Sequence, residues 1–260
     1  MTSVRTRQHG PTLHVVLSRP EARNALDVPT LRALRAHVQE AGADPGVRAI
    51  VLEAEGPTFS AGGDIRTMAA SAGRPLEVHA RLRDGLVPLV RTIHHVPKPV
   101  LAMVHGDAHG AGAILAFQCD LTLVARGARF TLAFRNVGLV PDTGGTWLLP
   151  RTLGMQRAKM LAWTGRAFSG EEAVAWGLAL SAHAPDELRA AVEGLAAELA
   201  AGPRTAIGLQ KAAFHRHAGA TLDAALEGEA RLQALASTSA EHAEGRDAFL
   251  QKRKPDFTVL

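Results

Sequence analysis

Two strand-like apolar segments each lead into a glycine-rich turn that precedes the start of a helix. The first turn lies in residues 56–66, GPTFSAGGDIR, and the second in residues 106–112, GDAHGAG. Glycine lets the backbone approach a ligand closely, and the N–H groups at a helix start have no intrahelical partner. The repeated arrangement predicts two loops that direct N–H donors at one site, where they would stabilise a developing oxyanion.

The segments around these turns predict an α/β fold. Residues 12–18 and 48–54 have the pattern of strands, and residues 27–43 between them predict a helix capped by Asp27, with Pro29 in its first turn. A strand, a helix and a second strand in so short a stretch are typical of a parallel crossover unit. Residues 68–95 predict a helix in two pieces, broken near the glycine and proline of residues 73–75.

The second half of the chain predicts fewer strands and more helices. Further strands are expected at residues 99–105, 120–125, 128–132 and 178–182, and further helices at residues 186–201, 203–217, 221–236 and 241–253. Asp186 is expected to cap the first of these helices, and Ser169 with Glu172 and Thr238 with Glu241 have the pattern of capping boxes. We therefore expect a mixed core over residues 1–200 and a helical part over residues 201–260.

Composition excludes several classes of protein. Apolar residues make up 47% and charged residues 21% of the chain, which argues against disorder, and no apolar run is long enough to span a membrane. The net charge of +4 comes without a dense basic run or interleaved aromatic residues, so nucleic acid is not an expected partner. A single cysteine, Cys119, in an apolar stretch predicts a buried thiol and fits a cytoplasmic location.

Motifs for the common cofactors are missing. No phosphate-binding G-x-x-x-x-G-K-[ST] occurs, and Gly110 and Gly112 lack the third glycine of a dinucleotide fingerprint. His105 and His109 flank a glycine-rich turn rather than lying on one helix face, so no metal is expected. A serine nucleophile is disfavoured because no G-x-S-x-G elbow is present. His109 adjoins the expected donors, either as a pocket-wall imidazole or as a participant.

Two aspartates lie inside glycine-rich loops. Asp64 directly precedes a helix, so its expected role is to cap that helix. Asp142 is flanked by apolar residues in the sequence GLVPDTGGTWLL. Apolar surroundings raise the pKa of a carboxyl group towards neutrality, which suits a general base or acid. Asp142 is therefore the predicted catalytic carboxylate.

The strings FSAGGDI, VHGDAHGAGA and GLVPDTGGTWLLPR resemble the signatures of the crotonase, or enoyl-CoA hydratase/isomerase, superfamily. The resemblance runs nearly end to end, from RPEARNAL at residues 19–26 to FLQKRKPDF near the C-terminus. It implies a crotonase-like spiral of ββα units, with a helical C-terminal part that forms a homotrimer or a dimer of trimers. It implies an acyl-CoA thioester as substrate and no separate cofactor.

The resemblance also implies roles for individual residues. Gly63 and Ala111, which follows Gly110, match the positions whose N–H groups hold the thioester oxygen. Positions that contact coenzyme A in the family, mostly through backbone, fall here at Arg23, Ala25, Ala61, Asp64 and Ile65.

One departure from the family pattern is informative. The two glutamates with which the hydratases add water are replaced here by Ile114 and Phe134. The string around Asp142 resembles instead the branch that isomerises ring-epoxidised phenylacetyl-CoA, and related enoyl-CoA isomerases, which use one aspartate at this position. We expect Ile114, Phe134, Met68 and Trp147 to form a dry pocket wall.

The sequence thus favours an acyl-CoA isomerase in which Asp142 moves the proton. Enoyl-CoA hydration, or other enolate chemistry such as thioester hydrolysis, remains an alternative. A non-catalytic acyl-CoA-binding protein is a further alternative, because both glutamate positions have diverged.

Overall fold

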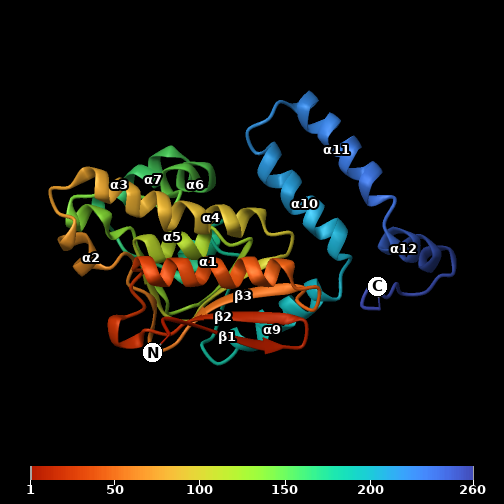
Figure 1. Cartoon of the computed structure of the whole chain (residues 1–260), viewed down its shortest axis with the longest axis horizontal. Coiled ribbons are helices and arrows are strands. Elements are labelled where there is room, and N and C mark those ends of the chain that lie inside the picture. Colours follow the sequence, from red (N-terminus) through yellow and green to blue (C-terminus); the bar gives the residue numbers. More distant parts are fainter. Residues whose placement is uncertain (1, 260) are drawn as a thin grey trace.

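A computed structural model describes residues 2–259, and its centre is a twisted sheet of parallel strands with one antiparallel edge strand (Figure 1). In spatial order the six strands are β1 (Val4–His9), β2 (Thr12–Leu17), β3 (Ala49–Ala54), β5 (Val100–Val104), β7 (Leu121–Ala125) and β10 (Ser181–His183). The expected crossover is confirmed, because β2 pairs in parallel with β3 across α1 (Val28–Ala43).

A second, smaller sheet is built from short strands. Its order is β4 (Thr58–Ser60), β6 (Asp107–His109), β8 (Arg129–Thr131) and β9 (Phe168–Ser169). The first three strands run parallel, and β9 is antiparallel to β8. The sequence prediction missed β4 and β6, because a three-residue strand leaves too few residues for an alternating pattern.

Each repeating unit of the spiral contributes one strand to each sheet and then a helix. The units are β3–β4–α2 (Ile65–Ala70), β5–β6–α5 (Ala111–Phe117), and β7–β8 followed by the 3-10 segment η2 (Ala133–Val137) and α6 (Gly145–Leu153). The expected spiral of ββα units is thereby confirmed. Both glycine-rich loops follow strands of the small sheet, so its parallel pairing brings them together.

Helices cover the large sheet. α1 packs against both α4 (Leu86–His95) and β2, and its N-terminus is capped as expected, since Asp27 Oδ1 accepts a hydrogen bond of 2.9 Å from the Thr30 N–H. The helix expected over residues 68–95 is in three pieces, because α3 (Pro75–Asp84) ends at Gly85. A side chain at Gly85 would meet Leu31 Cδ1 at 2.9 Å, so the break lets α1 approach closely.

Several boundaries differ from the sequence predictions. Strand β1 was not expected, and the strand predicted over residues 178–182 lies at Ser181–His183. Helix α9 (Leu188–Ala200) has Glu187 at its N-cap without a side-chain bond, so the Asp186 cap is wrong. The last helix, α12 (Ala240–Leu250), is capped by Ser239 instead of Thr238, whereas the Ser169–Glu172 capping box before α8 (Gly170–Ala175) is confirmed.

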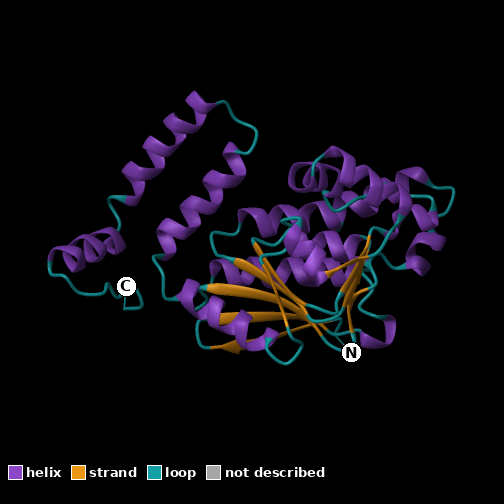
Figure 2. Cartoon of the chain, turned by 180° about the vertical axis from the view of Figure 1, so that it is seen from behind, coloured by secondary structure: helices purple, strands orange, loops and turns teal. Residues whose placement is uncertain are grey.

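The C-terminal helices stand apart from the sheets (Figures 1 and 2). α10 (Arg204–His217) touches α4, and α11 (Leu222–Ala236) packs mainly on α10. Large apolar side chains on this part are exposed, among them Phe214, Leu222 and Phe249. The boundary at residue 200 and a role of these helices in a trimer stay predictions. No helix within residues 2–259 is both long enough and apolar enough to cross a membrane.

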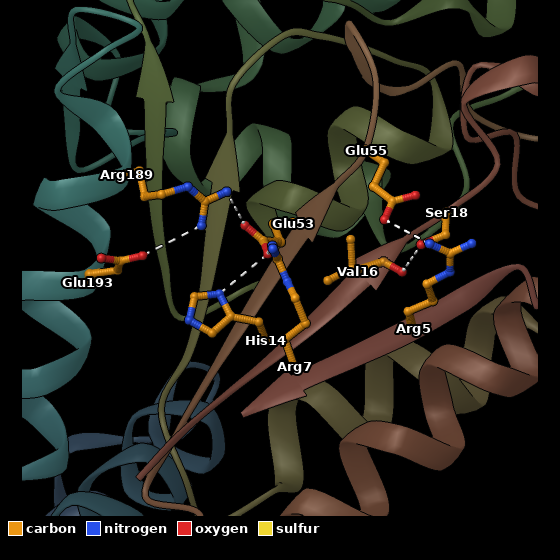
Figure 3. Close-up of polar contacts among 9 residues, drawn as sticks. All are labelled: Arg5, Arg7, His14, Val16, Ser18, Glu53, Glu55, Arg189 and Glu193. Carbon is orange, nitrogen blue, oxygen red and sulfur yellow. Dashed lines mark hydrogen bonds and ion pairs between the residues drawn. The ribbon is translucent and has the colours of Figure 1, made fainter. Parts of the chain in front are cut away.

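An ion-pair cluster around a buried carboxylate joins the large sheet to α9 (Figure 3). The carboxylate of Glu53 is only 1% exposed and pairs with Arg7 and, at 3.0 Å, with Arg189 of α9. The Nδ1 atom of His14 lies 3.5 Å from it, which is long for a hydrogen bond. Burial raises the pKa of Glu53, but His14, Arg7 and Arg189 outweigh it and lower the pKa from 4.5 to about 2.

This cluster predicts an acid-sensitive part of the stability. At about 1.36 kcal/mol per pKa unit, a shift from 4.5 to about 2 corresponds to about 3 kcal/mol. A lowered pKa stabilises the folded state above the unfolded pKa. This contribution to the free energy of unfolding should therefore be lost progressively as the pH falls from about 4.5 through about 2.

Urea unfolding of Glu53→Gln against wild type between pH 7 and pH 2 measures this contribution. The difference should be largest at neutral pH and shrink towards pH 2. Glu55→Gln is the matched control, because Glu55 pairs with Arg5 at 3.4 Å in an exposed position and should change stability by less than about 1 kcal/mol. A pH-independent difference between Glu53→Gln and wild type would contradict the assignment.

Candidate active site

The two glycine-rich loops touch at Gly62. This residue has φ +90°, and a Cβ atom there would lie 2.6 Å from the His109 carbonyl oxygen and 3.3 Å from the Ala111 nitrogen. Both neighbours are backbone atoms, which have little freedom to move aside. Only glycine therefore allows the loops after β4 and β6 to approach so closely.

The first loop is held in place by the segment before α1. The Leu26 N–H donates to the Gly62 carbonyl at 2.8 Å, and the Asp64 N–H donates to the Leu26 carbonyl at 3.2 Å. The Ala61 N–H donates to the Arg23 carbonyl at 2.8 Å. These bonds lock the backbone on both sides of Gly63, so the direction of its N–H group is fixed.

Two backbone donors remain unused at the meeting point. Within residues 2–259 neither Gly63 N–H nor Ala111 N–H donates a hydrogen bond. Ala111 is the first residue of α5, so its N–H lacks an intrahelical acceptor, and Gly110 precedes it with φ 49°. A pair of fixed, unpaired donors, one of them at a helix start, is suited to hold a carbonyl oxygen that becomes negative.

A cavity of about 190 Å³ opens beside Gly63 and Asp142. Its polar lining consists of Asp64, Thr67, Arg81 and Asp142. The remaining lining side chains are apolar: Leu26, Val28, Leu31, Met68, Val78, Leu82, Leu86, Leu139 and Val140. An apolar chain with a reactive polar end would fit such a lining.

Asp142 presents a partly desolvated carboxylate to this cavity. Burial raises its pKa, whereas a hydrogen bond from Thr143, its own backbone and the charge of Arg81 lower the pKa and leave a net increase. Thr143 Oγ1 donates to Asp142 Oδ1 at 2.8 Å, and no side chain within residues 2–259 donates to Oδ2. One carboxylate oxygen is therefore available to accept a proton.

Arg81 is a polar lining residue that sequence reasoning missed. It reaches the cavity from α3, where Nη1 donates to the Thr67 carbonyl at 2.8 Å and to Ser71 Oγ at 2.9 Å. These bonds tie α3 to α2 and place a positive charge near Asp142. Nothing in the sequence around Arg81 indicates that its side chain reaches a cavity, because arginines are common on the solvent-exposed faces of amphipathic helices.

Asp64 caps α2, as predicted. Its Oδ1 accepts from the Arg66 N–H at 2.9 Å and from the Thr67 N–H at 3.3 Å, and Arg19 lies 3.6 Å from Oδ2. Its carboxylate is thus already engaged, in contrast to that of Asp142. The proposed coenzyme A positions surround this cap: Arg23 and Ile65 are exposed, Ala61 is half-buried and Ala25 is buried.

The predicted dry wall is only partly present. Met68 lines the cavity, but Ile114 and Phe134 are buried and do not line it. Ile114 lies next to Gly145, and Phe134 lies next to Gly110. Trp147 does not line the cavity. It packs 6.3 Å from the ring of His94 and beneath the Arg151 guanidinium. The reason is helical geometry, since Gly145 and Leu149 of α6 face the core and a residue midway between them points outward.

The histidines of the second loop have separate environments. Burial lowers the pKa of His109, and Arg23 lowers it further against the opposing charge of Asp107. His105 instead bonds the Gly56 carbonyl through Nε2 at 2.7 Å. No group of three or more potential metal ligands occurs in the part of the chain described here.

Fold and site together define an enzyme of the crotonase superfamily, and comparisons with known proteins agree. The sequence model of the enoyl-CoA hydratase/isomerase family matches residues 8–259. A probable enoyl-CoA hydratase of Rhodobacter capsulatus is 41% identical over 94% of this chain and 93% of its own. The 1,2-epoxyphenylacetyl-CoA isomerase of Escherichia coli is 38% identical over 94% of each chain.

Solved structures agree with the sequence comparison. The crystal structure of an enoyl-CoA hydratase from Polaromonas superimposes with a TM-score of 0.93 at 32% identity, covering 97% of this chain and 98% of the other. The chain belongs to the enoyl-CoA hydratase/isomerase family, whose members act on acyl-CoA thioesters. The relatives carry both hydratase and isomerase names at similar identity.

Proposed function

We propose that the protein is an acyl-CoA isomerase in which Asp142 moves the proton. The observation that carries the proposal is the state of the two carboxylates that line the cavity. Asp64 is occupied as a helix cap, whereas Asp142 has a free oxygen and a raised pKa. A single carboxylate is sufficient for isomerisation, because it removes a proton at one carbon and returns it at another.

The backbone donors would complete the reaction. The thioester oxygen would accept hydrogen bonds from the N–H groups of Gly63 and Ala111, which stabilise the enolate that forms when the proton leaves. A donor of this kind is typically worth about 3–4 kcal/mol of transition-state stabilisation. The apolar lining around Met68 and Leu86 excludes water, so the enolate is protected from stray protonation until Asp142 returns the proton.

Hydration is the second candidate, favoured by the 41% identity to a probable hydratase. Addition of water needs one group to activate the water and another to protonate the enolate. The positions that carry the hydratase glutamates hold Ile114 and Phe134, and both side chains are buried and apolar. Neither can transfer a proton, so this candidate would need a water bound by Asp142 alone.

Product analysis in isotopically labelled water separates the two reactions. The purified protein is incubated with 2-enoyl-, 3-enoyl- and ring-epoxidised acyl-CoA thioesters in ¹⁸O-labelled water, and products are identified by mass spectrometry. Isomerisation gives products of unchanged mass without ¹⁸O. A hydroxyacyl-CoA that carries ¹⁸O as the main product would identify a hydratase, free acid would identify a hydrolase, and binding without turnover would identify a silent acyl-CoA-binding protein.

A further inference from the structure

Gln118 connects the end of α5 to the loop that carries Asp142. Its side chain is only 3% exposed and follows directly after the last residue of α5. Its Nε2 donates to the Thr143 carbonyl at 2.8 Å, and its Oε1 lies 2.8 Å from Nε2 of His94. One buried amide thus links α5, α4 and the Asp142 loop.

The loop at Thr143 has a backbone conformation that needs such support. Thr143 has φ 55° and Gly144 has φ 79°, and a left-handed conformation is unfavourable for a β-branched residue such as threonine. Thr143 is also the residue whose hydroxyl bonds Asp142 Oδ1. A Cβ atom at Gly144 would lie 2.4 Å from Gln118 Nε2, so the loop and the amide are packed without a gap.

The Thr143 carbonyl fixes which way the amide of Gln118 points. A carbonyl oxygen only accepts, so the amide nitrogen must face it. Gln118 Oε1 then faces His94, and His94 donates to it from an Nε2–H. The His94 ring is in turn stacked on His215 of α10, with ring centroids 4.2 Å apart and an interplanar angle of 17°. The chain of contacts therefore starts at α10 and ends at the carboxylate.

We infer that Gln118 is a positioning residue for Asp142, and that the hydrogen bond from His94 to its amide oxygen helps to hold it in place. Its bond to the Thr143 carbonyl keeps Thr143 and Gly144 in their left-handed conformation, and the Thr143 hydroxyl then directs the Asp142 carboxylate towards the cavity. The inference rests on the proposed function, because it takes Asp142 as the group that moves the proton.

A double-mutant cycle between Gln118 and Asp142 tests this role. Gln118→Met keeps the length of the side chain and removes both hydrogen bonds. In the otherwise native chain it should lower kcat for isomerisation by about 10- to 100-fold with little change in KM, because the base is misplaced and the apolar lining is intact. In the Asp142→Asn background the same substitution should cause no further loss in the residual rate.

Cys119→Ala is the matched control. Cys119 is buried in the same turn, and within residues 2–259 its Sγ has no hydrogen-bond partner besides the Leu115 carbonyl, so kcat should stay near that of the wild type. His94→Phe is the second variant, which keeps a ring in the stack but removes the donor. It should lower kcat in the same direction by several-fold, since the amide of Gln118 then loses the bond that holds its oxygen.

The outcomes separate the inference from the function on which it rests. An equal loss for Gln118→Met with and without Asp142 would mean that Gln118 supports the fold or the backbone donors, and the inference would be wrong. The inference would also be wrong if Gln118→Met and His94→Phe kept the wild-type kcat while Asp142→Asn was inactive. In that case the proposed function would still stand. Near wild-type isomerisation by Asp142→Asn would overturn both.

Discussion

Replacing Asp142 with asparagine is expected to lower kcat for isomerisation by about 10²- to 10⁴-fold, the usual contribution of a positioned general base. The change keeps the shape of the side chain and its ability to accept from Thr143 Oγ1, a bond of 2.8 Å in the structure. The fold should therefore be retained, and KM should change little. Steady-state kinetics with an enoyl-CoA substrate measures the effect.

The pH dependence gives a second readout of the same carboxylate. Asp142 acts as a base when it is ionised. The value of kcat should therefore be highest above the pKa of Asp142 and fall as the pH drops through that pKa. Because burial raises the pKa of Asp142, this loss should occur at a higher pH than for an ordinary aspartate. The acid limb should disappear from the residual activity of Asp142→Asn.

Asp44→Asn is a suitable control for these measurements. Asp44 also lies in a loop, where Oδ1 accepts from the Gly46 N–H at 2.8 Å, but it is remote from the cavity. Its substitution should leave kcat and its pH profile unchanged. If Asp142→Asn retained a rate within about threefold of the wild type, no general-base role could be assigned to it.

The second large effect is expected for Gly62→Ala. The new methyl group would meet the His109 carbonyl at 2.6 Å, and alanine would have to adopt φ +90°. We expect the free energy of unfolding to fall by about 2–4 kcal/mol from the combined strain and overlap. The loops would separate, the N–H groups of Gly63 and Ala111 would no longer converge, and kcat should fall by about 10²-fold.

Gly10→Ala separates backbone strain from loop contact. Gly10 also has a left-handed backbone, with φ 56°, but a Cβ atom there would have no neighbour within 4 Å. This variant should lose only about 1–2 kcal/mol of stability and keep its activity. Thermal unfolding and kinetics of both variants measure the two effects. Equal kcat values for Gly62→Ala and Gly10→Ala would rule out contact of the loops as the basis of catalysis.

Much of the fold and the place of the two glycine-rich loops could be predicted because their signals are local. Asp27 caps α1 through the Thr30 N–H three residues later, and Ser169 with Glu172 forms the expected capping box. Glycine pairs after strands indicate where the backbone must turn, and apolar neighbours around Asp142 indicate desolvation. These signals lie within a few residues of one another, so the sequence displays them directly.

The predictions that failed also rested on local signals. Asp186 and Thr238 are good capping residues, yet α9 and α12 start elsewhere. Trp147 looked like a pocket-wall residue from its neighbours in sequence, but the orientation of α6 turns it towards His94. The break at Gly85 was invisible because it depends on contact with Leu31, which belongs to another helix.

By itself the sequence determined the family, the two glycine-rich loops and the role of Asp64 as a helix cap, and it singled out Asp142 as the candidate base. Only the tertiary structure decided how these parts meet: the contact of Gly62 with His109 and Ala111, the place of Arg81 in the cavity, and the bond from Gln118 to Thr143. The physical reason is distance along the chain. These contacts join different units of the spiral, so they exist only after the two sheets have formed and brought their loops together.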